Sequence, residues 1–329
     1  MAELSKPTLQ ESIAQQREAL SEKLHDPLYR LAQACSAVWG DRARLDAALV
    51  DALDGILHCK FLYALDTHAI QVSSNVSRDG LIEKDFGRDR SQRPYMCEVV
   101  PSTGFLLSHA YISLRARRPS LTAIQIVRDA GGTVLGFVGA DFDLRDLPLT
   151  RDLYEEPRYW RQIKGDPSIR GAVFQQTRFE SEMERRMDTV LSVVEELMVD
   201  HGVFHVILHF SSNRAVVWVV DDPFRYRLLD IQALIDPDIC LAYPKRPYPK
   251  DCMVPAKYIR PVLEEFRVLR LMDEMLYLRS GTLNIFNGVV GLTFSCDGSH
   301  YIPYDEFLKT DYAFWIGGAN SSMLDIDNG

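Results

Sequence analysis

The chain has 329 residues, of which 47% are hydrophobic and 25% are charged, a composition that predicts a globular protein with room for two domains. Its 46 acidic and 37 basic side chains give a formal charge of -9. This balance excludes the extended basic surface with which proteins bind nucleic acid or anionic lipid, so we expect neither as a partner.

The N-terminal 24 residues are polar and helical in pattern, and they lack the continuous apolar core of a signal peptide. No later stretch approaches the roughly 18 apolar residues of a membrane-spanning helix. We therefore predict a cytoplasmic protein without a membrane partner. The six cysteines are scattered, without a CxxC pair or zinc spacing, and favour reduced thiols. We expect no cofactor.

Residues 1–60 are predicted to form a helical segment that precedes the sheet. Apolar side chains recur every three or four residues from Leu9 to Leu31, as on a helix with one buried face. We expect Pro27 to kink or divide this helix. A second helix is predicted from about Asp41 to Leu57.

Residues 61–150 predict a sheet of five strands. A hairpin turns at Asp66-Thr67-His68, and three β-branched or aromatic runs follow, the last two separated by Asp129-Ala130-Gly131-Gly132. Local hairpin connections, with helices at one end, favour an antiparallel α+β sheet.

Residues 151–202 predict a connecting segment and a helix from about Thr177 to Asp200, which Gly202 ends. This helix is either a signalling or dimerising helix that links the sensor domain to its output, or a helix that simply packs on its own domain. Residues 203–329 predict a second α+β module with two hairpins and a helix from Ala256 to Leu278, and we assign it no role.

The order of these elements in residues 61–150, and three short motifs within them, resemble the Cache family of extracellular, PAS-like sensors in bacterial chemoreceptors and histidine kinases. The motifs are Arg93-Pro94-Tyr95-Met96, Tyr111-Ile112-Ser113 and Gly139-Ala140-Asp141-Phe142. The resemblance covers about residues 9–150. It implies a PAS-like five-stranded sheet with a long N-terminal helix.

The resemblance also implies a ligand site. In family members that bind amino acids, an Arg followed by aromatic residues holds the ligand carboxylate, and a Tyr-x-Asp with a terminal Asp holds the amine. The matching residues here are Arg88, Arg93, Tyr95, Met96, Tyr111, Ser113 and Asp141. Arg88 stands where the family has Tyr, Tyr95 replaces Trp, Met96 replaces Tyr and Ser113 replaces Asp.

The retained residue types favour a ligand with a carboxylate. The guanidinium of Arg93 offers a planar pair of donors that matches a carboxylate, and Tyr95 adds a hydroxyl and an apolar wall. An ammonium group prefers several anionic or aromatic partners, and Ser113 removes one of them. The ligand is therefore either an amino acid or a small organic acid that bridges Arg88 and Arg93.

Each of these residues also has a structural explanation. The arginines at 88, 90 and 93 can form a solvated charged loop with Asp89, in which surface pairs contribute about 0 to 1 kcal/mol. The tyrosines can be core residues, and Asp141 can cap a turn.

Taken together, the residues predict a bacterial sensor that recognises a small carboxylate-bearing metabolite. The loop from Gly87 to Met96 closes over the sheet and shifts the connecting helix, which changes a homodimer contact or the contact with an unidentified signalling partner. An enzyme with its site in the C-terminal module or between domains is the alternative, although the sequence has no P-loop, GxGxxG or GxSxG motif. An adaptor whose pocket is filled by its own side chains is the third possibility.

Overall fold

A computed structural model describes residues 8–98, 100, 103–114, 116–147, 154, 177–295 and 298–315 of the chain. The chain divides into two compact units that alternate along the sequence. Unit 1 comprises Met1–Tyr159, Ser192–Gly202 and Gln232–Pro247, and unit 2 comprises Trp160–Leu191, Val203–Ile231 and Tyr248–Gly329. The sequence-based division at residues 61, 151 and 203 stays a prediction, and most of its connecting segment (151–176, except Tyr154) lies outside the described residues.

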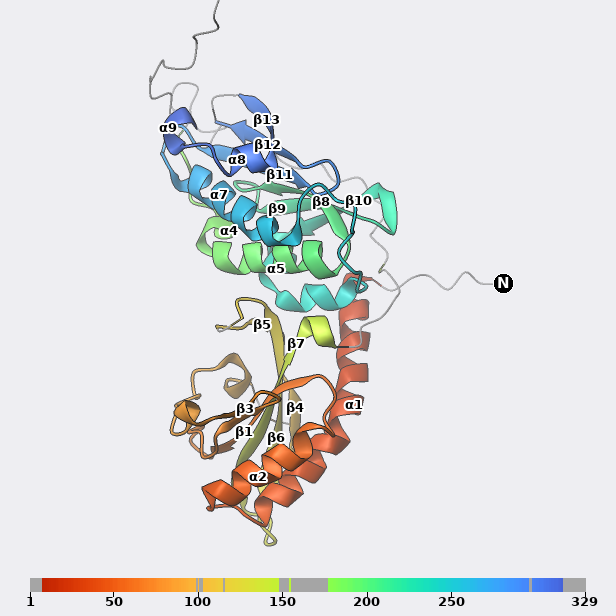
Figure 1. The fold of residues 1–329 in the computed structure, drawn as a ribbon, viewed down its shortest axis with the longest axis vertical. Coiled ribbons are helices and arrows are strands. Elements are labelled where there is room, and N and C mark those ends of the chain that lie inside the picture. Colours follow the sequence, from red (N-terminus) through yellow and green to blue (C-terminus); the bar gives the residue numbers. More distant parts are fainter. Residues whose placement is uncertain are drawn as a thin grey trace, which may run out of the picture. The chain divides into compact units, whose positions relative to one another are not determined.

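Unit 1 opens with two helices, α1 (Leu9–Ser36) and α2 (Arg42–Leu53), as Figure 1 shows. The side chain of Thr8 and the carboxylate of Glu11 cap each other's backbone N–H groups at the start of α1. The prediction that Pro27 kinks or divides the helix is wrong on the second count, since α1 is one helix. Leu24 and Leu28, on either side of Pro27, are both buried, and this packing keeps the two parts of the helix together.

The sheet of unit 1 is antiparallel, with the strand order β3-β2-β1-β7-β6-β4, and β5 pairs with β6. Its strands are β1 (Cys59–Asp66), β2 (Asn75–Ser77), β3 (Gly80–Ile82), β4 (Phe105–Leu107), β5 (Tyr111–Ile112), β6 (Pro119–Arg128) and β7 (Val134–Asp143). The predicted α+β class with a long N-terminal helix is confirmed. The sheet has seven strands rather than five. The predicted strand after the Asp66-Thr67-His68 turn forms only isolated bridges at Ile70 and Gln71, and three-residue strands too short to show a sequence pattern extend both edges of the sheet.

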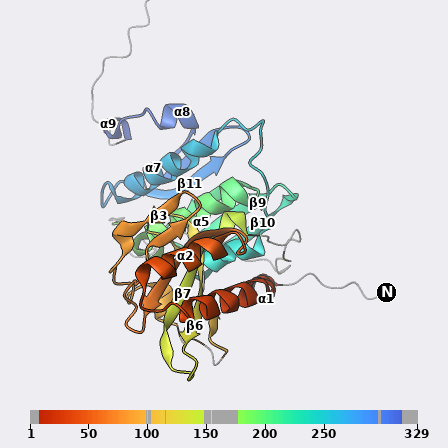
Figure 2. The ribbon, with the colours of Figure 1, turned by 60° about the horizontal axis from the view of Figure 1, so that its bottom comes forward.

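The two faces of this sheet have different neighbours. Helix α1 packs on β4, β6 and β7, and α2 packs on β1 and β2. Figure 2 shows α1 beside β6 and β7. Because side chains alternate across a strand, Tyr63, Thr122 and Asp141 share one face, and Leu62, Ala123 and Ala140 share the other. The loop between β3 and β4, which carries the short helices η1 (Glu83–Asp85) and η2 (Pro94–Met96), lies over the face of Asp141.

Later segments also belong to unit 1. These are the short helix η3 (Leu144–Asp146) after β7, the C-terminal part of α5 (Met187–Asp200), all but the first residue of α6 (Ile231–Ile235), and the short helix η4 (Pro237–Ala242). The predicted helix from Thr177 is shorter than expected, since helix begins at α4 (Glu182–Arg185) and continues as α5 after a break at Arg186. Gly202, with φ of 71°, follows α5 as predicted.

Unit 2 contains an antiparallel sheet of six strands in the order β10-β9-β8-β11-β12-β13. The strands are β8 (Val203–His209), β9 (Arg214–Val219), β10 (Asp222–Asp230), β11 (Leu278–Asn284), β12 (Val289–Phe294) and β13 (Ser299–Pro303). The sheet consists of two three-stranded meanders that meet at β8 and β11. The short helices of unit 2 include η5 (Ala256–Tyr258), α8 (Tyr304–Phe307) and α9 (Tyr312–Trp315).

Helix α7 (Ile259–Leu271) packs on β11, where a side chain at Gly281 would overlap the ring of Phe266. The predicted second α+β module is therefore confirmed as a fold, with a helix shorter than the predicted 256–278. Cys296 and Asp297, in the turn of the second predicted hairpin, lie outside the described residues. The five described cysteines are free thiols.

None of the helices that the structure describes has both the length and the apolar character needed to cross a bilayer.

Candidate ligand-binding site

A cavity of about 580 Å³ lies over the sheet of unit 1, on the face that carries Asp141. Its walls come from β1, β2, β6 and β7, from the β5–β6 hairpin and from the loop that contains η1 and η2. Six of the seven predicted site residues line it: Arg88, Arg93, Tyr95, Tyr111, Ser113 and Asp141. Met96 does not line the cavity and instead packs against a buried cluster of Tyr63, Leu65, Tyr95 and Ile124.

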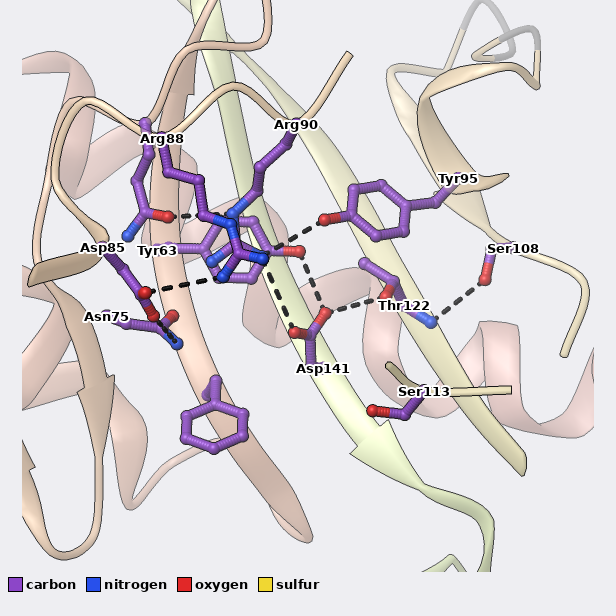
Figure 3. Close-up of polar contacts among 12 residues, drawn as sticks. Tyr63, Asn75, Asp85, Arg88, Arg90, Tyr95, Ser108, Ser113, Thr122 and Asp141 are labelled. Carbon is purple, nitrogen blue, oxygen red and sulfur yellow. Dashed lines mark hydrogen bonds and ion pairs between the residues drawn. The ribbon is translucent and has the colours of Figure 1, made fainter. Parts of the chain in front are cut away.

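Asp141 is the central acceptor of this site. Its Oδ1 accepts a hydrogen bond of 2.9 Å from the Tyr63 hydroxyl and one of 2.7 Å from Thr122 Oγ1. Thr122 Oγ1 lies 2.7 Å from the Tyr111 hydroxyl, which donates to it because the Thr122 proton is directed at Asp141. Figure 3 shows Tyr63, Thr122 and Arg90 converging on the carboxylate.

The other carboxylate oxygen, Asp141 Oδ2, has one ion pair with the described residues, 4.0 Å from Arg90 NH1. Burial raises the pKa of Asp141, while the charge of Arg90 and the hydrogen bonds from Thr122 and Tyr63 act in the opposite direction. The free lone pairs of Oδ2 are therefore the part of Asp141 that can receive a ligand donor.

Arg90 also lines the cavity, although the sequence-based prediction did not include it among the site residues. Its side chain is only 5% exposed, its Nε donates to Gln71 Oε1 at 2.8 Å, and its NH1 donates to the Tyr95 hydroxyl at 3.2 Å. The guanidinium also lies 3.9 Å from the ring centre of Tyr63. The sequence presents Arg90 as one of several charged loop residues, and nothing in its local pattern separates a buried arginine from exposed ones.

Backbone pairing explains why Arg90 is buried. Gly87 N donates to Gln71 O, Gln71 N donates to Arg88 O, and Arg90 N donates to Ala69 O, at 2.8 to 2.9 Å. These bonds hold the loop against the segment after β1, and Arg90 lies in the paired stretch with its side chain bonded to Gln71 and Tyr95. Arg88 is exposed at 42%, although its NH1 approaches Asp85 at 3.5 Å.

A close approach between strands allows Tyr63 to reach Asp141. Gly139 pairs with Tyr63 across β1 and β7, and a Cβ atom at Gly139 would lie 2.4 Å from the Tyr63 ring. The absent side chain leaves room for the ring to lie over β7. Burial raises the pKa of Tyr63, Tyr95 and Tyr111, so all three remain neutral hydroxyl groups at physiological pH.

The lining is positively charged overall. Five of its side chains are cationic and three are acidic, namely Lys60, Lys84, Arg88, Arg90 and Arg93 against Asp85, Asp141 and Asp143. Several already have partners, since Lys60 pairs with Asp146 at 2.7 Å and Asp143 pairs with Arg145 at 2.6 Å. This surplus of positive charge favours an anionic ligand.

Arg93 is half-buried, and its guanidinium has no hydrogen bond or ion pair with the side chains that the structure describes. Its charge lowers the pKa of both Asp141 and Tyr111, although burial is the larger effect at each. Arg93 is therefore close to these groups, lines the cavity and keeps its donors free. Within the described part of the chain, no cluster of His, Cys, Asp and Glu could hold a metal ion.

No protein-family model matches the chain, and no curated protein matches it. Solved structures do match. One is an extracellular ligand binding receptor from Desulfohalobium retbaense, at 16% identity and a TM-score of 0.34, with 42% of this chain and 25% of that chain covered.

Two further matches are chemoreceptor domains. The ligand-binding domain of a Pseudomonas fluorescens chemoreceptor in complex with L-serine has 19% identity and a TM-score of 0.30, with 41% of this chain and 55% of that chain covered. The sensory domain of a Campylobacter jejuni chemoreceptor with isoleucine bound has 12% identity and a TM-score of 0.32, with 41% and 55% covered. The chain thus spans between a quarter and about half of the matched proteins, which are sensor domains of the type that the sequence resemblance named.

The prediction of a cytoplasmic protein is wrong on this comparison, because the matched structures include an extracellular receptor and ligand-binding domains of chemoreceptors. That prediction rested on the lack of a signal peptide and of a spanning helix in the sequence, and neither absence determines a compartment.

Proposed function

We propose that unit 1 is a small-molecule sensor and that its cavity binds a metabolite with a carboxylate group. The observation that carries this proposal is the guanidinium of Arg93, which lines a cavity of about 580 Å³ and has no partner among the described side chains. A half-buried arginine without a partner is costly unless a ligand or water satisfies its donors. A carboxylate supplies two acceptors in the matching planar geometry.

Asp141 binds a hydrogen-bond donor elsewhere on the ligand. An amino acid would place its ammonium group against Oδ2, where Tyr111, which also lines the cavity, adds a favourable contact. An organic acid with a hydroxyl group would donate to the same oxygen. Ser113 contributes a neutral hydroxyl where a second carboxylate would favour the amine, so both ligand classes belong to the proposal.

The loop from Gly87 to Met96 is the element that responds to the ligand. It carries Arg88, Arg90 and Arg93, and it is joined to the sheet through the backbone of Ala69 and Gln71. A carboxylate bound by Arg93 draws this loop toward Asp141. The β5–β6 hairpin, which supplies Tyr111 and Ser113, contacts α5 through Arg118, and this contact passes the change to a homodimer or to a signalling partner.

A thermal-shift screen of the full chain against organic acids, amino acids and matched amines without a carboxylate tests the proposal. A ligand at 100 times its Kd stabilises the folded protein by about 2.7 kcal/mol. We expect hits among carboxylates and none among the matched amines. The hit should lose its effect in Arg93→Ala and keep it in Arg30→Ala, which removes an exposed arginine of α1 away from the cavity.

A folded wild-type protein that no carboxylate stabilises would contradict the proposal. A carboxylate that stabilises Arg93→Ala as well as the wild type would show a different binding site.

A further inference from the structure

A second group of titratable side chains in unit 1 lies behind the β5–β6 hairpin. Arg118 in this hairpin donates from Nε to Glu196 Oε2 at 2.9 Å and from NH2 to Asp200 Oδ2 at 2.5 Å. Both carboxylates belong to α5. Glu196 is fully buried, and its second oxygen, Oε1, faces away from Arg118.

The atom opposite Glu196 Oε1 is His201 Nε2, at 3.9 Å. Both side chains have no exposed surface, and neither atom has a hydrogen-bond partner within the described part of the chain. His201 Nδ1 lies 3.0 Å from the Tyr243 carbonyl oxygen, which can only accept. Nδ1 therefore carries a proton, and in the neutral ring Nε2 presents a lone pair to Glu196.

Glu196 Oε1 and His201 Nε2 are both acceptors, so a hydrogen bond between them requires one proton. Without a proton, the lone pairs of Oε1 and Nε2 repel and both remain unsatisfied. With two protons, an imidazolium is buried in the neighbourhood of Arg118 and Lys245, whose charges oppose it. At 3.9 Å the hydrogen bond is completed by a small rotation of the carboxyl group or by one bridging water.

We propose that Glu196 and His201 share a single proton in the folded protein, held as a neutral carboxylic acid beside a neutral imidazole, and that its loss makes the contact between the hairpin and α5 responsive to pH. The shared proton keeps Glu196 neutral toward Arg118. Its removal leaves a carboxylate that binds Arg118 more strongly, on the hairpin that supplies Tyr111 and Ser113 to the cavity. The inference does not depend on the proposed ligand.

The surrounding charges agree with the neutral form. Burial raises the pKa of Glu196 to about 7, with Asp200 and Asp143 adding to the increase and Arg118 opposing it. Burial lowers the pKa of His201 to about 4, with Lys245 and Arg118 acting in the same direction and the Tyr243 carbonyl opposing them. The remaining neighbours are Arg145, which pairs with Asp143, and the buried thiol of Cys240.

These shifts have opposite effects on stability. The raised pKa of Glu196 contributes stability that is present below its unfolded value of 4.5 and is lost as pH rises through about 7. The lowered pKa of His201 contributes stability that is present above its unfolded value of 6.5 and is lost as pH falls through about 4. Between pH 4.5 and 6.5 the two slopes cancel, because folding only moves one proton from the histidine to the glutamate.

Substituting one residue of the pair should reveal the pH dependence of stability that the other residue contributes. Glu196→Gln keeps an N–H for His201 and an oxygen for Arg118, and His201→Asn keeps an N–H for the Tyr243 carbonyl. The readout is the hydrogen-exchange protection of β6 and β7 in the full chain, corrected for intrinsic exchange. Each pKa unit corresponds to a tenfold change in the opening equilibrium.

From pH 4.5 to 6.5, protection should rise about tenfold or more in Glu196→Gln and fall by a similar factor in His201→Asn, relative to the wild type. The exposed carboxylate control, Glu22→Gln, should parallel the wild type. Parallel profiles for the wild type and Glu196→Gln would overturn the proposal.

The ring nitrogens of His201, observed by NMR in the wild-type protein, provide a test that needs no folded variant. The proposal requires a neutral ring with the proton on Nδ1 at pH 6. A doubly protonated ring at that pH would overturn it.

Discussion

Arg90 in unit 1 and Arg270 in unit 2 are each buried against a tyrosine ring. They differ in how many of their N–H donors are bonded to acceptors of the chain. Arg270 in unit 2 is completely buried, 4.7 Å from the ring centre of Tyr277. Its Nε donates to Glu184, NH1 donates to the Leu278 carbonyl, and NH2 donates to Ser211. Arg90 in unit 1 has two such bonds and then faces a cavity across from Asp141.

The difference separates a structural arginine from one in a binding site. A structural guanidinium directs its donors to acceptors of its own chain, because an unsatisfied buried charge costs several kcal/mol. In the cluster around Arg90, Asp141 Oδ2 has an ion pair of 4.0 Å with Arg90 NH1, and the guanidinium of Arg93 has no partner among the described side chains, so a ligand can complete the cluster. We therefore expect substitution of Arg270 to reduce stability, and substitution of Arg93 to reduce ligand binding with little effect on stability.

The largest loss of stability is expected for Arg270→Met. It leaves the buried carboxylate of Glu184 with Arg178 as its remaining cation, and we expect unit 2 to lose about 3 kcal/mol in urea unfolding. Arg267→Met, which removes a partly exposed partner of Asp188, should cost about 0 to 1 kcal/mol. Equal losses in the two variants would contradict a closed structural role for Arg270.

Gly139→Ala should have the next largest effect. The new methyl group would lie 2.4 Å from the Tyr63 ring, which has to leave Asp141, and overpacking of this kind costs about 1 to 3 kcal/mol. Calorimetric unfolding and ligand titration should both show the loss. Gly55→Ala, whose nearest atom is 3.4 Å away, serves as the control and should change neither.

Thr122→Val tests the hydrogen bonds that orient Asp141. The substitution keeps the shape of the side chain and removes its bonds with Asp141 and Tyr111, at a cost of about 1 to 2 kcal/mol in chemical unfolding. Ligand affinity should fall as well, because Asp141 is then free to rotate. Thr133→Val in the exposed turn before β7 should leave both quantities unchanged.

Arg93→Ala should have the smallest effect on stability, within about 0.5 kcal/mol in urea unfolding, because its guanidinium bonds to no described side chain. Its effect on ligand affinity should nevertheless be the largest of the series. A substantial loss of stability in this variant would mean that Arg93 is structural, like Arg270.

The elements that the sequence predicted are those with long, regular patterns. Helix α1, the paired strands β6 and β7 and the hairpin of β8 and β9 all have apolar periodicities that extend over six residues or more. The strands β2, β3 and β4 have three residues each, and their pairing depends on neighbours that are distant in the sequence. No local pattern could predict them.

The site was also predicted only in part, because local motifs identify some of its residues and long-range backbone pairing positions the others. Arg93, Tyr95, Tyr111 and Asp141 were identified by family motifs, and the fold places all four around one cavity. The burial of Arg90 follows from backbone bonds between residues 69–71 and 87–90, which only the folded chain defines. Met96 follows the motif but packs against the buried cluster of Tyr63, Leu65, Tyr95 and Ile124 and does not line the cavity.

The measurement that tests the central claim most directly is a crystal structure of the protein with a carboxylate identified by the screen. We predict that the ligand carboxylate lies within hydrogen-bond distance of the Arg93 guanidinium and that a ligand donor lies opposite Asp141 Oδ2. A ligand bound elsewhere, with the cavity unchanged or filled by the protein's own side chains, would contradict the account.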